Sequence, residues 1–390
     1  EINITPENPI IMSGYGSRDQ PFKGVHDSIY AQAIYLKNRT DEALIITADL
    51  IGFSHENVKL IKGMIREKTG IPENKMFITA AHNHGGPVNG TYGTDPPSDV
   101  KEYVDELHSK LVQIADEAQH HIVPVRIGYK KGECMMNINR RAVYSEGEVW
   151  LGRNPEGVCD HDLDIVKFCD LQDNLLAVFV NYPCHGTCTG QDNYLITGDW
   201  PGISARMLKE MLHEEMLHEE VIVMVTAGAS ADINPIYGPN NNFRETNAVA
   251  YGVASEARRL VSACIATEST ELLTAQTAIK LPGKKRWESS LPQESVPDGE
   301  VELFFSGIRI GNIMMIGISG ELFTEIGLDV KNGSVTNTMI LTHCNGASGY
   351  ICTDQAFEEG GYEPQVSHLM PGTEGAVESS MRFLVSKLRN

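Results

Sequence analysis

Six short apolar runs recur along the chain and constrain its fold more than any other feature of the sequence. They are 43–48 (ALIITA), 76–81 (MFITAA), 175–182 (LLAVFVNY), 221–226 (VIVMVT), 313–318 (IMMIGI) and 338–342 (TMILT). They show little alternation between apolar and polar residues, which is typical of strands covered on both faces. Stripes with helical spacing lie between some of them, at 58–65, 104–114 and 207–212. This order predicts an α/β fold of layered mixed β-sheets covered by helices.

Each apolar run ends in a segment that contains glycine or residues able to bind a metal. The six segments begin at Asp49, at His82 (HNHGGP), at Pro183 (PCHGT), at Ala227 (AGASAD), at Ser319 (SGE) and at His343 (HCNG). In layered α/β proteins, functional sites form at the carboxyl ends of strands. We therefore expect these six ends to converge on one site.

Composition excludes several other classes of protein. The 390 residues are 41% hydrophobic and 22% charged, so the chain is globular and can bury a large core without disulfides. No apolar run approaches the ~18 residues of a transmembrane helix. The net charge is −20 with no basic cluster, so nucleic acid is not an expected partner. The eight cysteines form no CxxC pair, and buried thiols are their expected state.

The strand ends offer several candidate site residues, each with a structural alternative. His82 and His84 would point to one face if the strand continued through them, and could share a metal or divide metal binding from proton transfer. They could equally be two histidines of a turn. His185 taken alone favours a structural histidine, Glu321 alone favours a residue that stabilises a helix N-terminus, and Tyr350 alone favours a packed loop aromatic. No GxSxG or Walker motif is present.

Taken together, these motifs resemble the amino-terminal catalytic domain of the neutral/alkaline non-lysosomal ceramidase family. The matching segments are NITP at 3–6, MSGYG at 12–16, TADL at 47–50, AAHNHGGP at 80–87, NR at 139–140, HGT at 185–187, TGDWPG at 197–202, DINP at 232–235, GE at 320–321 and GY at 349–350. Each segment is short, but their number and order make the match specific. The resemblance implies a single catalytic domain over 1–390, with 281–299 as an inserted hairpin or a surface excursion.

The family's zinc site implies roles for particular residues of this chain. By resemblance, His82, His185, Glu321 and Tyr350 hold one Zn²⁺, which activates water to hydrolyse an amide or ester of a small-molecule or lipid substrate. His84 then handles protons or orients the water. Arg140 contacts the substrate or stabilises an oxyanion. Asp49 is a weaker candidate for a residue that contacts a metal ligand rather than the metal itself.

The sequence also departs from the family's pattern. The family carries a serine where this chain has about Ala227 and Gly228, and Ser230 is shifted by two or three residues. With 390 residues, the chain is expected to be a short relative that lacks the carboxy-terminal immunoglobulin-like domain. Two alternatives stay open, namely the same metal site acting on a non-lipid amide, and a non-catalytic binding protein. The chain begins at Glu1, so we expect an upstream segment removed by a signal peptidase or in cloning, and the former predicts a secreted or periplasmic protein.

Overall fold

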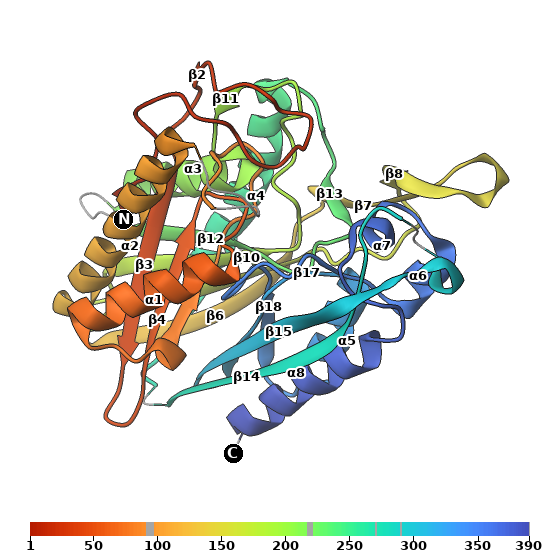
Figure 1. Cartoon of the computed structure of the whole chain (residues 1–390). Helices are drawn as coiled ribbons and strands as arrows, with labels where there is room; N and C mark the ends of the chain where they lie inside the picture. Colours follow the sequence, from red (N-terminus) through yellow and green to blue (C-terminus); the bar gives the residue numbers. More distant parts are fainter. Residues whose placement is uncertain (91–96, 217–220, 270, 289–290, 390) are drawn as a thin grey trace.

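Three four-stranded sheets form the framework of the part of the chain that the structure describes (Figure 1). The structure is a computed structural model that describes residues 1–90, 97–216, 221–269, 271–288 and 291–389. The first sheet has the order β1 (Ile2–Asn3), β3 (Tyr30–Lys37), β4 (Glu42–Ala48), β5 (Met76–Ile78). The second is β12 (Ile222–Ala227), β10 (Leu175–Tyr182), β9 (Asp162–Asp170), β6 (Val125–Glu133). The third is β14 (Leu272–Lys284), β15 (Pro297–Ile310), β16 (Ile313–Ile318), β18 (Asn337–Leu341).

Each of the six predicted apolar runs coincides with a strand of these sheets, namely β4, β5, β10, β12, β16 and β18. The pairs β4–β5, β10–β12 and β16–β18 are parallel, whereas the other pairs in the three sheets are antiparallel. The sheets are therefore mixed, as predicted. The carboxyl ends of each parallel pair lie at the same edge of their sheet.

Three smaller sheets join the loops that follow the strands. They are β2 (Gly24–Val25) with β11 (Leu195–Ile196), β13 (Ile233–Pro235) with β7 (Asn137–Val143) and β8 (Val149–Asn154), and β17 (Glu321–Leu322) with β19 (Tyr350–Ile351). The parallel β17–β19 pair sets Glu321 directly opposite Tyr350. The small sheets thus fix the loops that carry the candidate residues.

A pair of helices covers the outer face of each main sheet. The pairs are α1 (His55–Thr69) with α2 (Ser98–His120), α3 (Asp199–Met216) with α4 (Phe243–Ala263), and α5 (Thr324–Asn332) with α8 (Glu374–Arg389). Figure 1 shows the first pair beside β3 and β4, and the third pair beside β14 and β15. Two short helices, α6 (Asp354–Glu359) and α7 (Tyr362–Val366), lie between β19 and α8.

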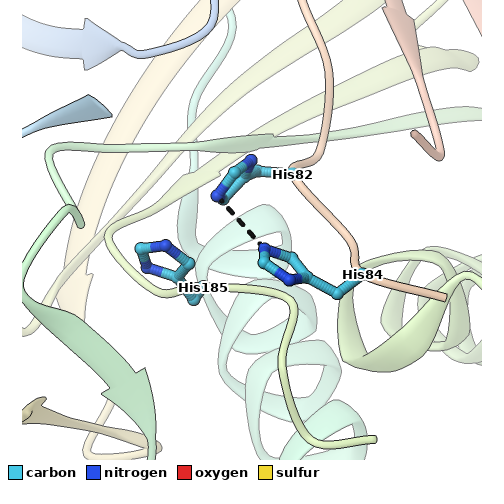
Figure 2. A group of neighbouring side chains, drawn as sticks. All are labelled: His82, His84 and His185. Atoms are coloured by element: carbon cyan, nitrogen blue, oxygen red, sulfur yellow. Dashed lines mark hydrogen bonds between the residues drawn. The ribbon is translucent and has the colours of Figure 1, made fainter. Parts of the chain in front are cut away.

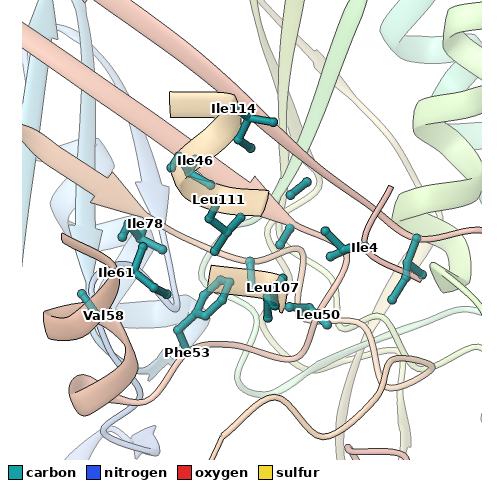
Figure 3. Packing of buried hydrophobic residues seen from close by; sticks show 14 of the residues in the cluster. Ile4, Ile46, Leu50, Phe53, Val58, Ile61, Ile78, Leu107, Leu111 and Ile114 are labelled. Atoms are coloured by element: carbon teal, nitrogen blue, oxygen red, sulfur yellow. The ribbon is translucent and has the colours of Figure 1, made fainter. Parts of the chain in front are cut away.

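The buried apolar residues form one central cluster and one cluster under each helix pair. The central cluster joins the inner faces of all three sheets, through residues such as Ile45, Phe179 and Met315. The cluster under α1 and α2 includes Ile46 and Leu111 (Figure 3). Since Ile45 and Ile46 of one strand enter different clusters, the strand is apolar on both faces, which explains the missing alternation.

Local signals set the ends of helix α1 where the sequence places its apolar stripe. The Ser54 side chain accepts a hydrogen bond from the Asn57 N–H, as an N-cap does. Gly70 ends the helix with a φ of 77°, a conformation that glycine adopts without a steric penalty. Glu321, in contrast, lies in β17, and the following helix α5 begins only at Thr324.

Residues 281–299 form the distal end of the β14–β15 hairpin, apart from 289–290, which lie outside the described residues. The register continues from Leu281 opposite Val301 to Lys284 opposite Pro297. All eight cysteines are free thiols, as expected, and seven of them are buried. Among the described helices, none combines the length and the apolar character that a membrane span requires.

Candidate functional site

His82 and His84 follow β5 in an irregular segment rather than in a continuous strand. The strand ends at Ile78, and His82 adopts a φ of 58°. The backbone of this segment pairs with the loop after β10, because the His84 N–H donates to Gly186 O and the Gly186 N–H donates to His82 O. The two imidazoles nevertheless converge, with their Nε2 atoms 3.4 Å apart (Figure 2).

His185 lies in the loop after β10 and completes the three histidines of Figure 2. Its side chain is fully buried, and its Nδ1 lies 2.7 Å from Ser230 O and 3.0 Å from Ile233 O. The Nδ1 of His82 lies 2.7 Å from Ile51 O. These carbonyl oxygens hold the proton on Nδ1 in both rings, so each Nε2 has a free lone pair.

Glu321 brings a carboxylate to the two imidazoles. Its Oε2 lies 3.2 Å from His185 Nε2 and 3.4 Å from His82 Nε2. Burial alone would raise the pKa of Glu321, but His82 and His185 outweigh burial and hold the pKa well below its usual range. Burial, with the nearby Arg140 and His82, lowers the pKa of His185 to about 3. The site therefore presents a neutral imidazole at His185 and an ionised carboxylate at Glu321, the protonation states that bind a metal.

The spacing of these atoms matches the donor set of a tetrahedral zinc site. Ligands about 2.0–2.1 Å from zinc in a tetrahedron stand about 3.3 Å from one another. Glu321 Oε2 lies 3.2 Å from His185 Nε2 and 3.4 Å from His82 Nε2. His82 Nε2 lies 3.4 Å from His84 Nε2. The Nε2 atoms of His82 and His185 and the Oε2 of Glu321 are therefore spaced as ligands of one metal would be, and His84 Nε2 lies beside His82. Carboxylate and imidazole are also donors that zinc accepts.

Tyr350 and Arg140 lie beside Glu321. The β17–β19 register sets Tyr350 opposite Glu321, and the Arg140 Nη2 donates to the Tyr350 hydroxyl at 3.1 Å. Burial, with the Glu321 charge, raises the pKa of Tyr350 well above its usual value. Arg140 is 4% exposed, and its guanidinium also donates to Glu363 Oε1 (2.8 Å) and Asn234 Oδ1 (3.3 Å). The structure thus brings together six of the seven residues assigned by resemblance, with His84 Nε2 beside His82 and Tyr350 on the strand beside Glu321.

His343 belongs to the same cluster, although the sequence analysis gave it no role. Its ring stacks on His82 with centroids 3.8 Å apart and planes 15° apart. Ligand atoms of His82, Glu321 and His343 all lie within 4.8 Å of one another. Its place directly after β18, at one of the six predicted ends, was the signal that could have identified it.

Glu363 is a second residue that the sequence analysis missed. It is 1% exposed and accepts hydrogen bonds from both Arg140 and Arg141, at 2.8 and 3.0 Å. It therefore fixes the guanidinium that faces Tyr350. Glu363 lies in none of the motifs noted in the sequence. It belongs to α7, more than 200 residues along the chain from Arg140, so the sequence alone does not link the two residues.

Three further residues noted in the sequence make contacts of other kinds. The Asp49 carboxylate accepts from the Tyr30 N–H at 2.9 Å, while the carbonyl oxygen of Ile51 positions His82. Ser230 is 2% exposed and contacts His185 through its carbonyl oxygen. A side-chain carbon at Gly228 would lie 2.8 Å from Pro183 Cγ, so a larger residue there would displace this loop.

Comparisons with known proteins identify the family and the fold of this chain. A profile of the family "Neutral/alkaline non-lysosomal ceramidase, N-terminal" matches residues 4–284. The neutral ceramidase of Drosophila pseudoobscura pseudoobscura is 25% identical over 220 residues, which cover 53% of this chain and 30% of that protein. The neutral ceramidase of Oryza sativa subsp. japonica is 23% identical over 215 residues, covering 53% and 27%. The chain thus matches less than a third of the length of these relatives.

Two solved structures share the fold over nearly the whole chain. A structure described as "Ceramidase complexed with C2" superposes with a TM-score of 0.84 at 15% identity and covers 99% of this chain and 74% of that one. The neutral ceramidase from Pseudomonas aeruginosa superposes with a TM-score of 0.79 at 16% identity, covering 99% and 73%. Because the family profile spans most of the sequence, the chain belongs to the neutral/alkaline non-lysosomal ceramidase family.

Proposed function

We propose that this protein is a zinc-dependent hydrolase that cleaves an amide bond, with N-acyl lipids of the ceramide type as its substrate class. The observation that carries the proposal is the spacing of 3.2–3.4 Å between Glu321 Oε2 and the imidazole nitrogens of His82 and His185. Relatives that match the chain are described as neutral ceramidases, which supports the reaction class.

The residues divide into metal ligands and groups that act on the substrate. His82, His185, Glu321 and Tyr350 would hold the zinc. Zinc at this position supplies a Lewis acid that polarises the substrate carbonyl and makes water nucleophilic at neutral pH. His84, with its Nε2 directed at His82, takes a proton from the attacking water and returns it to the leaving nitrogen.

Arg140 stabilises the negative charge that develops on the carbonyl oxygen. Its guanidinium is buried, permanently charged and held by Glu363 and Asn234. A donor fixed in advance needs no reorganisation during the reaction, and such donors contribute about 10²–10³ in rate. Arg140 therefore acts as the preorganised cation of the proposed site.

A series of aromatic rings connects Arg140 with the protein surface. The ring of Tyr362 lies 5.9 Å from those of Tyr350, Trp150 and Trp287, and Arg140 stacks over Tyr350 and Tyr362. Trp150 is 39% exposed and Trp287 is 54% exposed. Tryptophan and tyrosine favour the boundary between apolar and aqueous phases, so this side of the site suits a substrate with an apolar part.

The metal and the division of roles are tested together. Purified protein should hold close to one zinc per chain, and His82→Ala and His185→Ala should lose both zinc and hydrolysis of an N-acyl amide. His84→Ala should retain zinc and lose activity by about 10²–10⁴-fold, as expected for loss of a proton-transfer group. His120→Ala, at an exposed position on α2, is the matched control. Loss of zinc in His84→Ala would make His84 a ligand instead, and full activity without zinc would refute the proposal.

The lipid class is tested by tryptophan fluorescence, because the chain has only three tryptophans. Trp200 is 1% exposed and serves as an internal reference, whereas Trp150 and Trp287 report on the aromatic side of the site. With neutral phosphatidylcholine vesicles, we expect a blue shift that Trp150→Phe and Trp287→Phe each reduce. No shift, combined with hydrolysis of a short water-soluble amide, would favour the non-lipid alternative. No hydrolysis of any amide or ester would favour a binding protein.

A further inference from the structure

A second pocket, of about 800 Å³, lies between helix α1, the β14–β15 hairpin and the loop that follows β18. None of the residues of the histidine cluster lines it. The loop separates the two, since Ser348 lines the pocket while His343 and Tyr350 of the same loop belong to the candidate site. Its volume is within the usual range for pockets that bind small molecules.

Lys62 supplies a positive charge inside this pocket, and Glu73, which also lines the pocket, attracts this charge without forming an ion pair with it. The side chain lines the pocket and is only 7% exposed. Within the described residues it makes no hydrogen bond and no ion pair, although the surrounding side chains do. A buried charge without a partner is costly, and burial lowers the pKa of Lys62 to about 8. Lys62 is therefore able to pair with a negative group from outside this chain.

Several other polar groups deep in the pocket are already engaged. His55 Nε2 lies 2.9 Å from Ser348 Oγ, and this hydroxyl also donates to Glu302 O at 3.1 Å. The Asn345 amide donates to Met76 O and to Ser306 Oγ, at 3.1 and 2.8 Å. Lys62 is thus a charged group of the pocket interior that remains available to a ligand, and His55 Nδ1 is a second polar atom there without a hydrogen-bond partner among the described residues.

The surroundings of Lys62 indicate the kind of anion. Val58, Val301 and Phe304 give the pocket an apolar wall. The exposed carboxylates of Glu56, Glu300 and Glu302 lie at its rim and disfavour a multiply charged anion such as phosphate. A single negative charge on an apolar body matches both features.

We propose that this pocket binds an organic monocarboxylate, whose carboxylate pairs with Lys62 and whose apolar part packs against Val58, Val301 and Phe304. The charged group replaces the water that an isolated ammonium would need, and the ion pair forms in a partly water-excluded site, where it is stronger than at the surface. This site is separate from the proposed hydrolytic site and does not depend on it.

Titration calorimetry with octanoate tests the proposal. We expect saturable binding to the wild type, weakened at least about tenfold in Lys62→Met, as for loss of one charge-assisted pair. Lys59→Met is the matched control, because Lys59 lies on the same helix and lines the same pocket but is exposed. Octanol, which has the same apolar body without the charge, and inorganic phosphate should both bind at least about tenfold more weakly than octanoate.

Four results would overturn the proposal, and the first three concern the ligands and Lys62. These three are no octanoate binding to the wild type at millimolar concentration, equal binding to Lys62→Met and wild type, and phosphate binding tighter than octanoate. Loss of binding in His185→Ala but not in Lys62→Met would place octanoate at the histidine cluster, and would also overturn it. A measurement on the wild type avoids any dependence on folding of the variant. Octanoate should protect Lys62, and not Lys59, from acetylation by acetic anhydride, as read by peptide mass spectrometry.

Discussion

Replacing Glu363 with glutamine should destabilise the protein and disable Arg140 at once. Glu363 is 1% exposed and bonds to Arg140 Nε and Arg141 Nη1 through separate carboxylate oxygens. Removing one member of a buried ion pair typically costs 3–5 kcal/mol, because a buried charge is left without compensation. Arg141 keeps Glu359 as an ionic partner, so only Arg140 is left with neutral partners alone. We therefore expect a cost at the lower end of this range, about 3 kcal/mol.

Urea unfolding followed by circular dichroism measures this cost. With a slope of about 3 kcal/mol per M, the midpoint of Glu363→Gln should fall by about 1 M. Glu359→Gln is the control, because Glu359 bonds to Arg141 from a side chain that is 40% exposed. Its midpoint should fall by less than about 0.3 M, since exposed pairs contribute at most about 1 kcal/mol. A Glu363→Gln midpoint as close to wild type as that of the control would refute the reasoning.

Three further substitutions test other contacts. Arg140→Lys should keep zinc and lose activity by about 10²–10³-fold, because an ammonium cannot make the guanidinium's several directed bonds; unchanged activity would remove Arg140 from the mechanism. His343→Phe keeps the stacking on His82 but should weaken zinc binding by about 10–100-fold in a chelator competition, and equal affinity would make His343 a packing residue. Burial raises the pKa of Asp49 to about 7. Between about pH 4 and pH 7 the folded protein therefore keeps a proton that the unfolded chain has lost, and the free energy of unfolding falls as pH rises through this range. Asp49→Asn should therefore have a urea midpoint above wild type by a margin that grows from pH 4 to pH 7 and is then constant; a margin independent of pH would contradict this.

The strands that apolar continuity predicts are those buried on both faces. Phe179 and Val180, for example, are adjacent in β10, are almost fully buried, and enter different clusters. The sheet partners β3 and β6 carry polar and half-buried residues such as Lys37 and Lys130, so they present no such run. The sequence therefore predicted the α/β class and the convergence of strand ends, but not that the chain builds three sheets around a shared core.

The candidate site was predictable where its residues occur in short motifs. His82, His84 and His185 lie in segments that resemble a family, and the structure brings their side chains together. Glu363 and Tyr362 lie in no such motif and act only through contacts across the fold, at the level of tertiary packing. A single sequence carries no signal for a contact of that kind.

Backbone conformation gives an independent reason to regard the histidine cluster as functional. His82 and His343 both adopt left-handed conformations, with φ of 58° and 55°, which are uncommon for residues other than glycine. Each such residue costs roughly 1–3 kcal/mol and persists only where surrounding contacts fix it. Here the Ile51 carbonyl fixes one ring, and the two rings stack on each other. Because these contacts all involve the imidazole rings, the side chains of the cluster and the strained backbone that carries them form one unit.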